Sequence, residues 1–262
     1  MADDLALLGP VLPVIAGLFG LVLGSFLNVC ILRWPKDESV IRPPSRCPGC
    51  GSGIAWYDNI PVVSWLLLRG KCRKCGEPIS IQYPLVELAT GLLWAWMAWR
   101  HGASLEALRG AAFGTILLGI AMADARFYII PDEFSLGGLA IGLLFSLAGG
   151  LPTLGHAVLG AAVGFGLLWL VGVLGTLAFK EEAMGGGDIK MMAMVGAFVG
   201  WTGVLLTIFL GALLGSLIFV PLALAGRKKH VPFGVFLALG AAAAYLAGPS
   251  LVTWYRDTFL FG

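Results

Sequence analysis

Two aspartates stand where long apolar runs begin or end, and a carboxylate is costly at such a place. Asp188 lies in the segment GGGDIK (185–190), between two apolar stretches. Asp124 closes an earlier apolar run, after Ala121-Met122-Ala123. An acid at the edge of a membrane segment is expensive unless it is paired or used. We therefore expect Asp124 and Asp188 to meet in the folded protein and to form a catalytic dyad.

A pair of carboxylates that shares one proton can hydrolyse a peptide bond. The ionised carboxylate takes a proton from water, and the protonated one donates to the scissile carbonyl. Asp188 is expected at a helix N-terminus, which favours the anion. We accordingly expect Asp188 to be the base in the resting state, with the two roles open to exchange.

Each acid also has a simpler interpretation on its own. Asp124 could be a solvated helix end paired with Arg126, and Asp188 could be the N-cap of the helix that follows. Pro131 ends the segment after Asp124, and Asp132 is placed to cap the next helix. Glu87 lies close to an inner membrane boundary, where it could position substrate, although an acid at such a boundary is commonly only solvated.

Four cysteines form a second group with chemical potential. They are arranged as two C-x-x-C pairs, Cys47 with Cys50 and Cys72 with Cys75, separated by 21 residues. This spacing is typical of a closed, tetrahedral four-thiolate zinc site of structural type. The flanking basic residues are expected to favour the thiolate form. A disulfide pairing is not favoured, because the cytoplasm keeps thiols reduced.

The composition places these residues in a membrane protein. Of the 262 residues, 58% are hydrophobic and 12% are charged, against about 25% charged in ordinary soluble domains. The chain is therefore predicted to be an all-α polytopic membrane protein embedded in the lipid bilayer. A net charge of +2 does not indicate a nucleic-acid partner.

Apolar segments of about 20 residues are long enough to span a bilayer. Eight spans are predicted, at about 10–33, 84–100, 107–124, 134–150, 153–178, 188–201, 203–225 and 232–248. A turn at 200–203 (GWTG) is expected to divide the last long run. The first span carries small and polar residues at 24–28, which suit close helix packing or a substrate-facing stripe.

These spans predict three regions: the first helix (1–33), a zinc-binding cytoplasmic domain inserted after it (34–83) and a membrane-embedded core (84–262). Lysine and arginine favour the cytoplasmic side. With eight spans and both termini outside, cytoplasmic segments hold 14 of the 17 basic residues, including Arg227-Lys228-Lys229. Asp124 and Asp188 then lie at cytoplasmic helix ends.

The motifs together resemble the bacterial type 4 prepilin peptidases, which are GxGD-type intramembrane aspartyl proteases. The matching stretches, in chain order, are GSFLNV (24–29), the four-cysteine segment with DNIPVVSW (58–65), YPLVE (83–87), Asp124 with IPD (130–132), GGGDIK (185–190) and PFG (232–234).

The resemblance implies that Asp124 and Asp188 are catalytic. It implies cleavage of prepilins and type II secretion pseudopilins after a glycine, at the cytoplasmic face of the inner membrane. N-methylation of the new N-terminal residue from S-adenosylmethionine would follow. The cysteine segment favours this two-activity form over a peptidase alone. The methyl donor is expected to bind between residues 34–83 and the cytoplasmic helix ends.

Two other classes of function compete with this interpretation. A membrane transporter would use polar residues and a short helix at a midplane site, but it would carry charges deep within several helices. A scaffold that binds a partner through the cysteine domain would leave the two aspartates without a role.

Overall fold

The computed structural model describes residues 9–181, 183–224 and 231–260, and their secondary structure is helical apart from two isolated β-bridges. The basic run at 227–229 lies outside the described residues. The chain packs as two compact units, residues 1–119 and 120–262. The domain boundaries at 33 and 83 remain a prediction.

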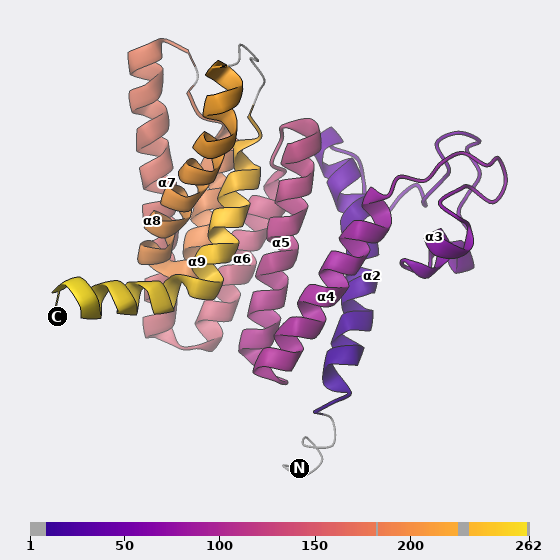
Figure 1. The fold of residues 1–262 in the computed structure, drawn as a ribbon, viewed down its shortest axis with the longest axis horizontal. Coiled ribbons are helices and arrows are strands. Elements are labelled where there is room, and N and C mark those ends of the chain that lie inside the picture. The colour runs from indigo at the N-terminus through magenta and orange to yellow at the C-terminus, as the bar shows by residue number, and fades with distance from the viewer. Residues whose placement is uncertain (1–8, 182, 225–230, 261–262) are drawn as a thin grey trace. The chain divides into compact units, whose positions relative to one another are not determined.

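The first unit is built on two helices that lie side by side, α2 (Leu12–Arg33) and α4 (Gln82–His101) (Figure 1). Glycines on α2 allow the close approach. A Cβ on Gly20 would lie 2.8 Å from the Thr90 carbonyl, and one on Gly24 would lie 2.7 Å from the Glu87 Cα. Small residues drive helix association in lipid in this way, which confirms the packing role predicted for 24–28.

Between α2 and α4 the chain forms only short helices. They are η1 (Trp34–Lys36), η2 (Trp56–Asn59) and α3 (Val63–Leu67). This segment contains the four cysteines. Two C-x-x-C turns, rather than a long helix or a sheet, dominate its fold.

The second unit contains the later helices, and α5 (Leu105–Phe127) runs across the boundary between the units. It is followed by α6 (Asp132–Ala148), α7 (Leu151–Phe179), α8 (Gly186–Leu224), α9 (Phe233–Tyr255) and the π-helical turn η3 (Arg256–Leu260). Helix α8 packs against α6, α7 and α9, so it is the centre of this unit (Figure 1).

Helix α8 doubles back at Gly200, whose φ of 72° and ψ of 177° are not helical. Met192 and Val204 both lie against Gly164 of α7. A Cβ on Gly164 would lie 2.8 Å from the Met192 carbonyl carbon and 3.4 Å from the Val204 Cγ2. Twelve residues of straight helix would separate them by about 18 Å. Helix α8 is therefore a hairpin of two helical segments, which confirms the predicted turn at 200–203.

The first segment of the α8 hairpin is enclosed on all sides. Every residue from 191 to 198 is buried, and Met191, Met192 and Met194 have no exposed surface. A helix that is apolar all round belongs in a core, and flexible methionine side chains fill irregular gaps there. The short helix that begins beside Asp188 is thus the best-packed part of the unit.

Each of the eight predicted apolar segments is helical over most of its described residues; residue 225, the end of the seventh, lies outside them. Among the described residues, four helices are long and apolar enough to cross a membrane: Leu12–Lys36, Leu105–Phe127, Leu151–Phe179 and Gly186–Leu222. The protein is therefore a multi-pass membrane protein. The count of eight spans remains a prediction.

The crossing of α7 and α8 gives a test of the fold. Gly160 of α7 and Gly196 of α8 lie backbone against backbone. A Cβ added to either residue would overlap the carbonyl oxygen of the other. We expect Gly160→Ala to destabilise the protein by at least about 1–3 kcal/mol, the usual cost of overpacking, and to lower its melting temperature in detergent.

The matched control is Gly166→Ala on the same helix, where an added Cβ meets nothing within 4 Å. It should leave the melting temperature unchanged or raise it slightly, because alanine favours the helix. Equal melting temperatures for the two variants would contradict this packing.

Candidate functional site

The four predicted cysteines come together in the first unit. The Sγ atoms of Cys47, Cys50, Cys72 and Cys75 all lie within 4.8 Å of one another, and those of Cys47 and Cys75 are 3.7 Å apart. Thiolates about 2.3 Å from a tetrahedral zinc ion are about 3.8 Å from one another. The cluster therefore fits a four-thiolate metal site.

The two C-x-x-C turns have the same backbone. The Cys47 N–H donates to the Ser52 carbonyl, and the Gly51 N–H donates back to the Cys47 carbonyl, both at 2.9 Å. In the second turn the Gly76 N–H donates to the Cys72 carbonyl at 2.9 Å. Gly51 and Gly76 have positive φ, which glycine adopts without strain. Each turn directs two thiols to one point.

Thiolate formation is supported by a group that the sequence did not suggest. The Ser52 hydroxyl lies 2.8 Å from the Cys50 Sγ, and this hydrogen bond is the main reason that the pKa of Cys50 is lowered to about 6. Arg73, one of the basic residues that flank the cysteines, pairs with Asp58 at 2.6 Å. Its hydrogen bonds lower the pKa of the Asp58 carboxyl.

Asp124 lies in the second unit and is only 6% exposed. Its Oδ2 accepts a hydrogen bond from the Val235 N–H at 3.1 Å, and the Gly234 N–H also bonds to the carboxylate. These N–H groups belong to the first turn of α9, which has no intrahelical acceptors for them. Asp124 is therefore not a solvated helix end, because it caps another helix with a buried carboxylate.

Asp188 is the third residue of α8, in the first turn rather than at the N-cap. Its Oδ1 is buried and has no hydrogen-bond partner among the described residues. A buried carboxylate oxygen without a donor is costly. This oxygen is therefore available to a proton, a water molecule or a substrate group.

Glycines beside the two aspartates both lie against Ile130. A Cβ on Gly187, next to Asp188, would lie 3.0 Å from the Ile130 Cβ. A Cβ on Gly234, next to the Asp124 carboxylate, would lie 2.8 Å from the Ile130 Cδ1 and 2.9 Å from the Asp124 Oδ2. The carboxylates are close enough to interact electrostatically. The absence of a side chain at Gly187 leaves room for Ile130, and its absence at Gly234 leaves room for Ile130 and the Asp124 carboxylate.

A salt bridge joins the helices that carry this region. The Lys190 Nζ lies 2.7 Å and 2.8 Å from the carboxylate oxygens of Asp132. Asp132 was predicted to cap α6, but Pro131 is at the N-cap and no side chain caps the helix. The pair instead ties the start of α6 to the start of α8. This pairing was not predicted from the sequence.

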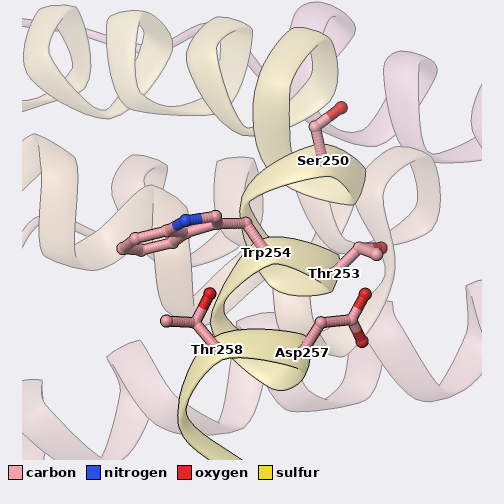
Figure 2. A pocket seen from close by; sticks show the side chains of 5 residues that line it. All are labelled: Ser250, Thr253, Trp254, Asp257 and Thr258. Atoms are coloured by element: carbon pink, nitrogen blue, oxygen red, sulfur yellow. The ribbon is translucent and has the colours of Figure 1, made fainter. Parts of the chain in front are cut away.

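Described residues of the second unit line a cavity at α9 and another at α7. One, of about 570 Å³, follows α9 and η3 and includes Trp254 and Asp257, but none of the predicted site residues (Figure 2). The other, of about 280 Å³, is mainly apolar, runs along α7 and includes Ile189, the neighbour of Asp188. The second cavity thus provides apolar space beside one of the two aspartates.

Glu87, the remaining acid near a predicted boundary, is in the first unit and is 7% exposed. The expectation that such an acid is simply solvated is therefore wrong. Its Oε2 accepts the Val62 N–H at 2.7 Å. This contact was not predicted from the sequence.

Comparison with known proteins identifies two matching families. Residues 18–101 match the bacterial peptidase A24 N-terminal domain, and residues 111–220 match the type IV leader peptidase family. No solved structure was found to match the chain.

Several curated relatives carry the name prepilin leader peptidase/N-methyltransferase. The protein of Aeromonas hydrophila is 38% identical, covering 93% of both chains, and that of Neisseria gonorrhoeae is 36% identical, covering 97% of this chain and 98% of the relative. The protein of Myxococcus xanthus is 40% identical over 83% of this chain, which spans 65% of that relative's length.

Proposed function

This chain belongs to the type IV prepilin leader peptidase/N-methyltransferase family, and we propose that it has both activities. It cleaves the leader peptides of type IV prepilins and type II secretion pseudopilins after a glycine. It then methylates the new N-terminal residue. The relatives' name supports both reactions, and the motif set supports the substrate class.

The observation that carries the peptidase proposal is the approach of Asp124 and Asp188 around Ile130. One carboxylate is held by backbone N–H groups, and the other has a free buried oxygen. This asymmetry is what an aspartic peptidase needs, because one acid must be ionised while the other is protonated.

We propose Asp124 as the base, in contrast to the sequence-based expectation for Asp188. Hydrogen bonds from backbone N–H groups, together with the N-terminal dipole of α9, favour the ionised form of Asp124. Asp124 removes a proton from water as the water oxygen attacks the scissile carbonyl carbon. Asp188, protonated on its free oxygen, donates its proton to the carbonyl oxygen.

The tetrahedral diol then collapses with the roles exchanged. Asp124 returns its proton to the leaving nitrogen, and Asp188 takes a proton from one hydroxyl as the C–N bond breaks. The products are a carboxylic acid on the leader and an amine on the mature protein, and both aspartates regain their starting states.

For the second activity, S-adenosylmethionine supplies the methyl group when it is bound. Carboxylates alone cannot supply one, so this activity needs residues beyond the dyad. Family members without a cysteine domain exist, and the presence of that domain here supports the two-activity form. The cysteine cluster itself holds a structural zinc ion, because four protein ligands leave no open coordination position.

For the membrane, we propose eight spans with both termini outside the cytoplasm, in the bacterial inner membrane. The hairpin of α8 supports two spans within one apolar run. The distribution of basic residues then follows the positive-inside rule, and both aspartates lie at the cytoplasmic face.

The dyad is tested by removing one charge at a time. Asp124→Asn and Asp188→Asn should each lower leader cleavage by roughly 100- to 10,000-fold, the range for general acid–base catalysis, because an amide keeps the shape but cannot ionise. Mass spectrometry of a prepilin peptide incubated with purified protein measures this. The control is Glu133→Gln, an exposed carboxylate on α6, which should cleave normally. Near-normal cleavage by either aspartate variant would remove that residue from the dyad.

The zinc site is tested by metal analysis of purified protein. Wild-type protein should contain about one zinc ion per chain, and Cys47→Ser or Cys75→Ser should lose it and loosen the segment from 34 to 83, because metal binding supplies folding energy. Cys30→Ser is the matched control, since Cys30 is a buried residue of α2 outside the cluster. Metal-free wild-type protein with four free thiols would argue against the site.

A further inference from the structure

Glu87 is a buried carboxylate that the peptidase reaction does not use. It lies on α4 in the first unit, and the Ser25 side chain of α2 is within hydrogen-bonding reach of it. Its Oε2 accepts the Val62 N–H at 2.7 Å. Among the described residues it forms no ion pair. A buried carboxylate without a cationic partner calls for an explanation, because isolated buried charges are costly.

The donor to Glu87 belongs to a strained turn. Val62 has φ 62° and ψ −50°, and the Val63 N–H donates to the Pro61 carbonyl at 2.6 Å. This is a γ-turn with positive φ, a rare and strained conformation, and a β-branched residue adopts it least readily. Strain of this kind is kept at ligand clamps and switches, where the surroundings hold it.

A second acceptor lies one helical turn away. Asn28 of α2 is fully buried, and its Nδ2 donates to the carbonyls of Gly24 and Tyr83 at 3.2 Å and 3.1 Å. Two carbonyl partners fix the amide orientation, because Nδ2 is the only donor of the side chain. The Oδ1 is then left buried with no partner among the described residues.

Asn28 and Glu87 belong to one polar cluster. Ser25 and Asn28 are three residues apart, so they share one face of α2. Gly24 on that helix lies directly against the Glu87 backbone. Tyr83, whose carbonyl binds Asn28, is one turn before Glu87 on α4, and helical side chains lean towards the preceding turn. The cluster presents hydrogen-bond acceptors, and no cationic side chain among the described residues is paired with its carboxylate.

We propose that this cluster, Ser25, Asn28 and Glu87, binds a primary ammonium group, namely the new N-terminus of the processed substrate. The inference rests on the proposed function, because leader cleavage is the step that creates this ammonium. A primary ammonium has three N–H donors and one positive charge. The Glu87 carboxylate, the Asn28 Oδ1 and the Ser25 hydroxyl are three acceptors that match them.

The Val62 turn acts as the cover of the cluster. Its N–H occupies the position of one donor of the ligand while the cluster is empty. When the ammonium binds, it replaces this N–H, and the backbone at Val62 relaxes to an ordinary conformation. The strain therefore favours exchange of the cover for the ligand.

The test compares two peptides that differ only in charge at one end. Both reproduce the N-terminal segment of the processed substrate, and one has a free N-terminus while the other is N-acetylated. Their Kd values are measured by fluorescence anisotropy on full-length protein in nanodiscs of phosphatidylcholine, which has no primary amine. Wild-type protein should bind the free peptide at least about tenfold more tightly, which corresponds to about 1.4 kcal/mol.

Glu87→Gln should bring the ratio of the two Kd values close to one, mainly by weakening the free peptide. The matched control is Glu106→Gln, an exposed acid of the same unit, which should keep the wild-type ratio. A structural role for Glu87 would weaken both peptides equally and leave the ratio unchanged, and that result would overturn the proposal. A wild-type ratio of one would also overturn it.

Val62→Gly provides a second variant that removes no polar group. Glycine accepts positive φ, so the covered state becomes more stable and binding of the free peptide should weaken several-fold. Tighter binding would contradict the role of the turn as a cover. This variant decides the question if Glu87→Gln does not accumulate.

Two further measurements separate the alternatives. If adding phosphatidylethanolamine to the nanodiscs abolishes the preference for the free peptide, the ammonium site belongs to that lipid headgroup, and the assignment to the substrate fails. Precursor cleavage by the same wild-type nanodiscs checks the proposed function. Cleavage without any preference between the two peptides would defeat this inference alone, whereas absence of cleavage would defeat the proposed function.

Discussion

A buried carboxylate needs donors, and the hydrogen bonds to Asp124 meet this need in the second unit. Asp124 lies in the last turn of α5, and its hydrogen-bond donors are the N–H groups in the first turn of α9. The N–H groups at the start of α9 stabilise the buried carboxylate, and the carboxylate in turn accepts hydrogen bonds from this helix start. Gly234 is required at the contact because a Cβ would lie 2.9 Å from the carboxylate. Two distant parts of the chain are thereby fixed to each other.

The hairpin of α8 limits the position of the second carboxylate, that of Asp188. Its first segment is packed on every side, so the residues before it have little freedom. Asp188 stands where this rigid segment begins, next to a glycine that lies against Ile130. Preorganisation of this kind is what acid–base chemistry requires, because small displacements of reacting groups cost large factors in rate.

The chemistry of the chain is divided between its two compact units. The aspartates lie in the unit that contains most of the match to the leader peptidase family, and the cysteine cluster and Glu87 lie in the unit that contains the A24 N-terminal domain. Each unit has a buried acidic residue, Glu87 or Asp124, that accepts hydrogen bonds from backbone N–H groups. The division agrees with a protein that carries out two successive reactions on one substrate.

The sequence predicted the helices well, because apolar runs separated by Gly, Pro and charged residues are strong local signals. It also predicted the cysteine cluster, since two C-x-x-C turns place their own ligands. It did not predict the Val235 bond to Asp124, the Lys190–Asp132 pair or the Val62 turn on Glu87. Each of these joins residues at least 25 positions apart, and local patterns carry no information about such contacts.

The sequence predicts Asp188 as the base, and the proposal of Asp124 rests on a contact that the sequence does not reveal. The helix that stabilises Asp124 begins 109 residues later in the chain, at Phe233. A local sequence pattern reports only the helix on which each acid lies. The effect of α9 on Asp124 became visible only when the two were placed together.

The central claim is that the two aspartates act as one catalytic unit, and a double-mutant comparison tests it most directly. Residual cleavage of a prepilin peptide would be measured for wild type, Asp124→Asn, Asp188→Asn and the double variant, with each protein folded and loaded with metal. Residues that act as a unit are strongly non-additive. The double variant should lose about as much activity as the more damaged single variant. Losses that multiply, as for two independent residues, would contradict it.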